Sequence, residues 1–194
     1  WNDLLNPVYK DMLIMPNPAS SGTGFLQVAS LLVMLDPDYK TKPVEENKAW
    51  DFLKELDKNM GQYIKSGSKP AKLTAAGEYA VGCSFAFVYS SLKKKGFPVA
   101  LVMPEEGAGF ELEANALLKG AKHEAAAKKF LDWALSEGAM KEYAKFKLGV
   151  AYPGIPGPEG LPALDTIKLA PMDFPWQSEN RTKILEVWQG HFLK

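Results

Sequence analysis

The chain has 194 residues, of which 46% are hydrophobic and 24% are charged, so it can bury a core and is not a disordered chain. Its length accommodates one large domain or two small ones. Its 23 basic and 23 acidic residues cancel, which argues against nucleic acid or an anionic membrane as a partner.

The first elements follow the order strand, loop, helix. Residues 11–15 form a short apolar run that Pro16 ends, which predicts a buried strand. Two prolines and two glycines between residues 16 and 24 exclude regular structure there. Apolar residues then recur at helical spacing from Phe25, which predicts a buried helix.

The middle of the chain alternates between helix and strand patterns. An amphipathic pattern predicts one long helix over 44–64. A basic last turn followed by Gly96 predicts another helix over 85–95. This part of the chain also holds a predicted short helix at 71–77, a predicted buried strand at 79–84 and a predicted strand at 98–103.

Helical patterns dominate the last part of the chain. Residues 110–119 alternate loosely, which is compatible with a strand, whereas four prolines and three glycines make 151–162 an irregular traverse. Amphipathic helices are predicted at 123–135, 137–146 and 179–192. Because strands and helices alternate, the predicted fold class is α/β with a largely parallel sheet.

The strongest chemical feature is the sequence Ser20-Ser21-Gly22-Thr23-Gly24, which lies between the first strand and its helix. The first N–H groups of a helix lack intrahelical partners and carry partial positive charge, so this loop can bind an anion. Neither the Walker A pattern nor the dinucleotide fingerprint is present. Helix capping by Ser or Thr explains the same residues equally well from local sequence alone.

Other chemistries find little support in the sequence. His123 and His191 have no partners at metal-ligand spacing, and Glu105 and Glu106 are adjacent residues that fit a solvated loop. The one cysteine, Cys83, lies in an apolar run and fits a buried hydrophobic position. We therefore expect no catalytic residue, no metal site and no cofactor, and the chain is not expected to be an enzyme.

Several stretches taken together resemble a family of bacterial proteins. The series resembles the periplasmic substrate-binding proteins of ABC transporters for ferric iron, phosphonates and sugar phosphates, which have the type II binding-protein fold. The matching stretches, in the family's order, are 1–10, 16–25, 77–82, 104–107 and 126–134.

This resemblance implies two α/β lobes joined by crossing strands, a ligand in the cleft between them, a transporter permease as partner, and a periplasmic or lipid-anchored extracytoplasmic location. By position, it assigns a small anionic ligand to Ser20, Ser21, Gly22 and Thr23. The same fold also serves as the ligand-sensing domain of regulators and receptors, which is the alternative function.

The sequence departs from the family at the position where ferric-iron binders carry adjacent tyrosines. This chain has Ser84-Phe85-Ala86-Phe87 there, which argues against direct tyrosinate binding of iron and favours an organic or phosphorylated anion. Ser84 and Phe85 follow the strand at its cleft end and are further candidates for ligand contact.

A second departure concerns the first lobe, most of which family members have before the position of Trp1. We expect residues 1–102 to form the second lobe with the anion-binding loop, and 103–155 to be a segment of the otherwise missing first lobe. The traverse and final helix at 156–194 would return to the second lobe. Helices of the incomplete lobe would expose apolar faces, through which the chain could self-associate.

Overall fold

The computed structural model describes residues 1–147 and 149–193. The chain divides into two compact units, one formed by Trp1–Phe110 with Lys168–Lys194 and the other by Glu111–Ile167. The units divide after residues 110 and 167, and the lobe boundaries that the sequence predicts after 102 and 155 stay predictions. The assignment of the units to the two lobes of a longer protein stays a prediction.

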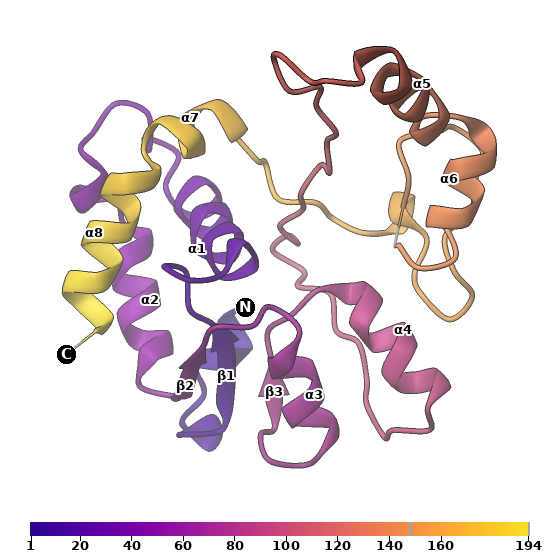
Figure 1. The fold of residues 1–194 in the computed structure, drawn as a ribbon. Coiled ribbons are helices and arrows are strands. Elements are labelled where there is room, and N and C mark those ends of the chain that lie inside the picture. The colour runs from indigo at the N-terminus through magenta and orange to yellow at the C-terminus, as the bar shows by residue number, and fades with distance from the viewer. Residues whose placement is uncertain (148, 194) are drawn as a thin grey trace. The chain divides into compact units, whose positions relative to one another are not determined.

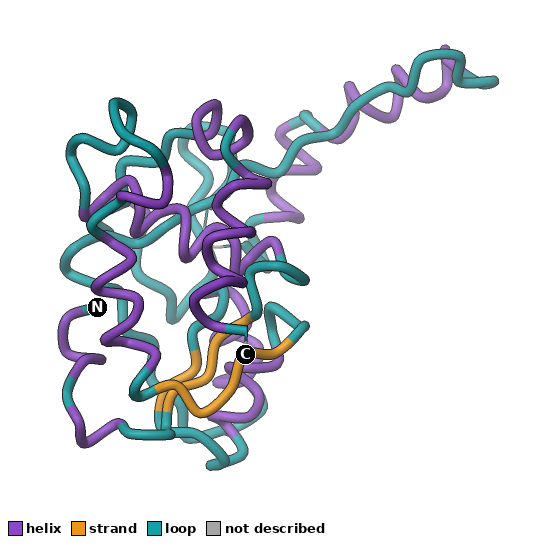
Figure 2. The backbone as a smooth tube through the Cα atoms, turned by 90° about the vertical axis from the view of Figure 1, so that its left-hand side faces the viewer, coloured by secondary structure: helices purple, strands orange, loops and turns teal. Residues whose placement is uncertain are grey.

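The larger unit contains a parallel three-stranded sheet (Figures 1 and 2). Its strands are β1 (Leu13–Pro16), β2 (Met60–Ile64) and β3 (Val81–Gly82), in the order β2-β1-β3. All four residues of the central strand β1 are buried, as expected for a parallel strand covered on both faces. The predicted α/β class with a parallel sheet is confirmed.

The prediction of one helix over 44–64 is wrong. The segment forms a 3₁₀ turn (Val44–Glu46), the helix α2 (Ala49–Asp57) and the strand β2. Buried Asn47 separates the first two elements, because its side chain donates to the Leu32 carbonyl and accepts from the Ala49 amide. Strand β2 has no clear alternation of buried and exposed residues, and its pairing with β1 makes it a strand.

The remaining predicted helices are present, with ends shifted by a few residues, and α7 lies in a region where no helix was predicted. The predicted strands at 98–103 and 110–119 are absent, and Ala108 instead forms an isolated parallel bridge with Leu169. The helices are α1 (Gly22–Leu35), α3 (Lys69–Ala75), α4 (Ala86–Lys94), α5 (Glu124–Ala134), α6 (Glu137–Tyr143), α7 (Phe174–Glu179) and α8 (Arg181–Phe192).

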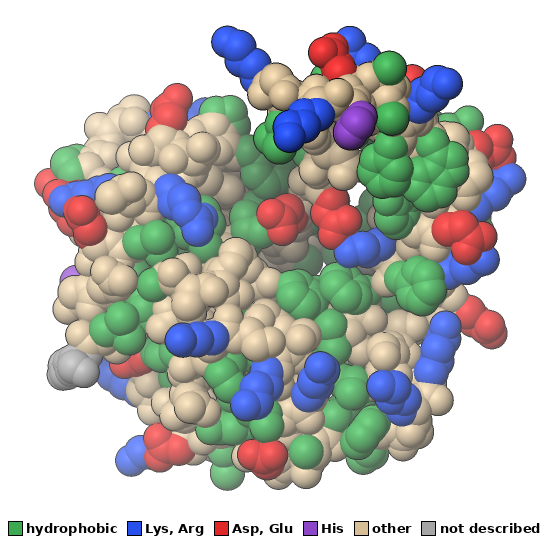
Figure 3. Space-filling model, viewed as in Figure 1, with side chains coloured by type: hydrophobic (Ala, Val, Ile, Leu, Met, Phe, Trp, Pro, Cys, Tyr) green, Lys and Arg blue, Asp and Glu red, His purple; other side chains and the backbone are tan. Residues whose placement is uncertain are grey.

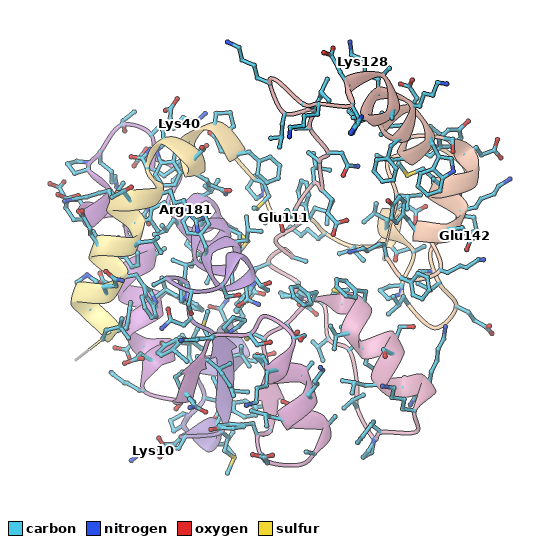
Figure 4. All side chains as sticks on the ribbon, viewed as in Figure 1. Lys10, Lys40, Glu111, Lys128, Glu142 and Arg181 are labelled. Atoms are coloured by element: carbon cyan, nitrogen blue, oxygen red, sulfur yellow. The ribbon has the colours of Figure 1, made fainter. Side chains whose placement is uncertain are left out.

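The main hydrophobic core joins β1 to α1, α2 and α8. Trp50 and Trp188 are among its largest fully buried side chains, and the Trp50 indole donates to the Val44 carbonyl at 2.7 Å. Arg181, labelled in Figure 4, covers the core at its edge, with its guanidinium 4.1 Å from the centre of the Phe25 ring. Among the described residues, no helix has the length and apolar character needed to cross a membrane.

Two aspartates tie the loop after α1 to its surroundings. Asp36 is fully buried and accepts hydrogen bonds from the Lys48 amide and the Lys42 ammonium, both at 2.9 Å. Burial would raise the pKa of Asp36, but these hydrogen bonds outweigh it and lower the pKa below its ordinary value. Asp173 contacts the Lys40 ammonium and the Tyr39 hydroxyl, each at 2.7 Å, and these groups lower its pKa to about 2.

Acid should remove the stabilisation that Asp173 provides. Because the pKa in the folded state is about 2 and the ordinary value is 3.8, the contribution is complete above about pH 4 and is lost toward about pH 2. We expect the free energy of unfolding, measured by urea denaturation, to fall more steeply over this range in the wild type than in Asp173→Asn. Equal slopes for the two proteins would contradict this assignment.

Candidate functional site

The predicted site residues lie at one edge of the sheet, where its parallel strands end. Ser20 to Thr23 follow β1, and Ser84 and Phe85 follow β3. The strand order is β2-β1-β3, so the chain crosses to the other side of β1 after it has formed β2. The point where the order of the strands reverses therefore lies between β1 and β3. Ligands of open parallel sheets bind in the crevice outside the carboxyl ends of the strands at such a point.

The loop before α1 leaves backbone donors free. The Asn17 carbonyl accepts from the amides of Ser20 at 3.1 Å and Ser21 at 2.9 Å, which closes the turn. The amides of Gly22 and Thr23 make no hydrogen bond to any residue that the structure describes. They are the first two residues of the 14-residue helix α1, where the helix dipole favours negative charge.

Ser21 caps α1, so helix capping explains the presence of this one serine in the loop. Its Oγ accepts from the Gly24 amide at 3.5 Å, which is a long hydrogen bond. As an acceptor in this bond, the hydroxyl keeps its hydrogen available for another acceptor. Capping and anion binding by Ser21 are therefore compatible with each other.

The two glycines of the loop have different surroundings. A Cβ on Gly24 would overlap the carbonyl group of Pro16, with its carbon only 2.8 Å away, so only glycine lets α1 start so close to the end of β1. A Cβ on Gly22 would meet no atom within 4 Å. Gly24 therefore fixes the position of the helix N-terminus, and Gly22 leaves its free amide accessible.

A third loop joins the two predicted groups of residues. The Ser84 hydroxyl donates to the Gly67 carbonyl at 2.7 Å. A Cβ on Gly67 would lie 2.5 Å from Thr23 Oγ1 and 2.7 Å from the Phe85 ring. The structure thus brings Thr23, Ser84 and Phe85 together around Gly67, which sequence reasoning missed.

The structure shows how Ser84 and Phe85 are held. Because the Ser84 hydroxyl donates to Gly67, it positions the loop after β2, and its role as a ligand contact stays a prediction. Phe85 lies directly before α4 and stacks on Phe87, with ring centres 4.9 Å apart and planes 4° from parallel. The Phe85 side chain has no hydrogen-bond donor and can supply only an apolar wall.

The neighbouring Cys83 packs against the main core. The residue is half-buried, and desolvation raises the pKa of its thiol to about 11, so the thiol stays protonated at neutral pH. Over residues 1–147 and 149–193, no group of three or more His, Cys, Asp or Glu side chains is placed to hold a metal ion. The chemistry that this edge of the sheet offers is hydrogen bonding by amides and hydroxyls.

Comparison with known proteins identifies the family. The sequence pattern of the bacterial extracellular solute-binding proteins matches residues 1–175. The chain belongs to this family. Membership confirms the predicted class of protein, which binds solutes, acts outside the cytoplasm and is not a class of enzymes.

Two curated relatives show similarity over part of their length. This solute-binding chain is 39% identical over 137 residues to an uncharacterized protein of Haemophilus influenzae, a match that covers 71% of the chain and 37% of the relative. It is 28% identical over 145 residues to the spermidine/putrescine-binding periplasmic protein of Salmonella typhimurium, a match that covers 75% of the chain and 40% of the relative. The chain therefore matches well under half of each relative.

Two solved structures resemble this solute-binding chain over nearly its whole length. The periplasmic binding protein AfuA of Actinobacillus pleuropneumoniae, solved with exogenous fructose-6-phosphate bound, has 34% identity and a TM-score of 0.82, and the match covers 99% of this chain and 59% of AfuA. The periplasmic binding protein P5PA has 30% identity and a TM-score of 0.73, and the match covers 99% of this chain and 60% of P5PA. About two fifths of each of these proteins has no counterpart here.

The two glycines of the loop allow a matched test of the α1 N-terminus. Gly24→Ala should lower the free energy of unfolding by about 2 kcal/mol or more, because the new Cβ collides with backbone that cannot easily move. Gly22→Ala should leave it unchanged or raise it by up to about 1 kcal/mol, because the space beside it is open and alanine restricts the unfolded chain more than glycine does. Urea denaturation of both variants measures the difference, and similar values would contradict the close approach at Gly24.

A methyl group on Gly67 should disturb the site more than the fold. In Gly67→Ala, the new Cβ displaces the side chains of Thr23 and Phe85, both of which can rotate, so we expect a loss of about 1 kcal/mol in stability. The amide resonances of Gly22 and Thr23 should shift in ¹⁵N NMR spectra of the variant. Unchanged resonances at both positions would show that Gly67 does not adjoin the helix N-terminus.

Proposed function

We propose that this chain supplies the anion-binding part of a solute-binding protein that captures a sugar phosphate for an ABC transporter. The free amides of Gly22 and Thr23 at the start of α1 are the observation that carries the proposal. They stand beside the hydroxyls of Ser20, Ser21 and Thr23, at the edge of a parallel sheet where ligands bind.

A phosphate group suits these donors chemically. Its terminal oxygens accept hydrogen bonds and carry negative charge, which the positive end of the α1 dipole stabilises. Charge-assisted hydrogen bonds of this kind are about twice as strong as neutral ones. The donors are fixed before the ligand arrives, because the Asn17 carbonyl closes the turn and Gly24 holds the helix against β1.

Several observations favour a sugar phosphate over the other solutes considered. The relative AfuA was solved with fructose-6-phosphate bound, and it is the more similar of the two structures described above. By the family resemblance, ferric-iron binders would carry tyrosines in the stretch where this chain has the stacked rings of Phe85 and Phe87, and phenyl rings cannot ligate iron. A polyamine, which is cationic, would be repelled by the N-terminus of α1.

The rest of the proposed mechanism concerns the longer protein to which such a chain would belong. The ligand would be held in a cleft completed by the other lobe, and closure of the lobes would exclude water from it. A permease in the membrane would then receive the ligand outside the cytoplasm. This chain alone would bind weakly, because it contributes one wall of that cleft.

NMR titration of the ¹⁵N-labelled chain tests the proposal. Fructose 6-phosphate and inorganic phosphate at millimolar concentration should shift the amides of Gly22 and Thr23, whereas fructose and spermidine should not. Thr23→Ala should weaken phosphate binding by about tenfold, because a hydrogen bond to a charged group is worth about 1.5 kcal/mol or more. Shifts produced equally by fructose, or by none of these compounds, would contradict the proposal.

A matched control separates binding from capping. Ser136 caps α6 as Ser21 caps α1, with its Oγ 3.3 Å from the Ala139 amide. Ser21→Ala and Ser136→Ala should each lower the free energy of unfolding by about 0.5 kcal/mol. Only Ser21→Ala should weaken phosphate binding in the titration, and equal binding by both variants would assign Ser21 to capping alone.

A further inference from the structure

The chain as a whole has no net charge, but its positive charge is unevenly distributed. Residues 65–97 contain six lysines and one acidic residue, Glu78, which gives this stretch a net charge of +5. All six lysines are exposed, and none forms an ion pair with a residue that the structure describes. Figure 3 shows lysine side chains over α3 and α4 on the face viewed. A local excess of one sign of charge raises the concentration of opposite ions beside it.

The six lysines fall into two groups in different local surroundings. One group consists of Lys65, Lys69 and Lys72, and the other of Lys93, Lys94 and Lys95. The second group lies at the end of α4, where the negative end of the helix dipole favours cations. In contrast, Lys69 is the first residue of α3, where the positive end of the helix disfavours a cation, and the first turn holds no acidic residue. Local structure thus explains the second group but not Lys69.

The first group borders the proposed anion site. Lys65 and Lys69 each lie two residues from Gly67 in the chain. A Cβ on Gly67 would lie only 2.5 Å from Thr23 Oγ1, so this loop adjoins the start of α1. Lys72 follows Lys69 by three residues, on the same face of α3. The second group is more distant, because it lies at the far end of α4, about 12 Å along the helix axis from the end that adjoins the site.

We propose that Lys65, Lys69 and Lys72, here called the basic rim, attract the ligand and give the site its preference for doubly charged phosphate esters. The inference rests on the proposed function, because it requires an anion at the start of α1. A phosphate monoester carries about two negative charges at pH 7.5, since its second pKa is about 6. A sulfate ester of the same sugar carries one. Attraction to the rim is proportional to the charge of the ligand, so it is twice as strong for the phosphate ester.

NMR titrations with fructose 6-phosphate and fructose 6-sulfate test this proposal, with the amides of Gly22 and Thr23 as reporters. The rim variant carries Lys65→Gln, Lys69→Gln and Lys72→Gln. In about 20 mM salt at pH 7.5, it should bind the phosphate ester about tenfold and the sulfate ester about threefold more weakly than the unaltered chain. In about 300 mM salt, both losses should fall below about twofold, because salt screens exposed charges.

The lysines at the end of α4 supply a control with the same change in net charge. The variant Lys93→Gln, Lys94→Gln, Lys95→Gln should bind the phosphate ester no more than about twofold more weakly, because these charges are farther from the site. Thermal unfolding followed by circular dichroism checks that each variant folds, and it gives a second readout. The α4 variant should have a lower Tm, whereas Lys69→Gln should leave the Tm equal or raise it. A lower Tm for Lys69→Gln would show that Lys69 stabilises α3 instead.

The outcomes separate this proposal from the proposed function. If no compound shifts the amides of Gly22 and Thr23 in the unaltered chain, both proposals fall. If fructose 6-phosphate shifts them but the rim variant loses no affinity, or loses as much for the sulfate ester or in the α4 variant, only the basic rim is overturned. Binding of the unaltered chain to phosphatidylglycerol vesicles, lost in the rim variant while its affinity for fructose 6-phosphate is unchanged, would also overturn it. The rim would then serve an anionic membrane.

Discussion

The contact between Gly24 and Pro16 sets the geometry on which the rest of the larger unit depends. Strand β1 is buried along its whole length, and α1 must start close to its end if the helix is to cover the sheet. A side chain at position 24 would collide with the Pro16 carbonyl group and move the helix away. The apolar residues of α1 would then lose their places in the core with α2 and α8.

The same contact has a chemical consequence at the helix N-terminus. The turn at Asn17 uses the amides of Ser20 and Ser21, and the next two amides stay free at the accessible side of the loop. The Ser21 cap is long, at 3.5 Å, so it satisfies the Gly24 amide without closing the loop to a ligand. A helix start that serves packing is in this way also a set of oriented donors for an anion.

The two units differ in how far each satisfies its own apolar surface. The larger unit buries two tryptophans and the whole of its central strand. Its aspartates Asp36 and Asp173 each form an ion pair with a lysine. The described part of the smaller unit buries alanines and leaves aromatic rings in solvent. The chain spans 59 to 60% of the solved proteins described above.

Local sequence determined the order strand, loop, helix at the start of the chain, the α/β class and the loop at Ser20 to Thr23. These features depend on the spacing of apolar residues and on the glycines and prolines that interrupt regular structure, and both signals act over a few residues. It could not reveal strand β2, whose residues have no strand pattern and pair with β1 across 45 or more positions. Nor could it reveal Gly67, which reaches the site because β2 ends beside β1. Which loops meet at the edge of a sheet depends on the order of its strands, and only tertiary contacts between distant segments decide that order.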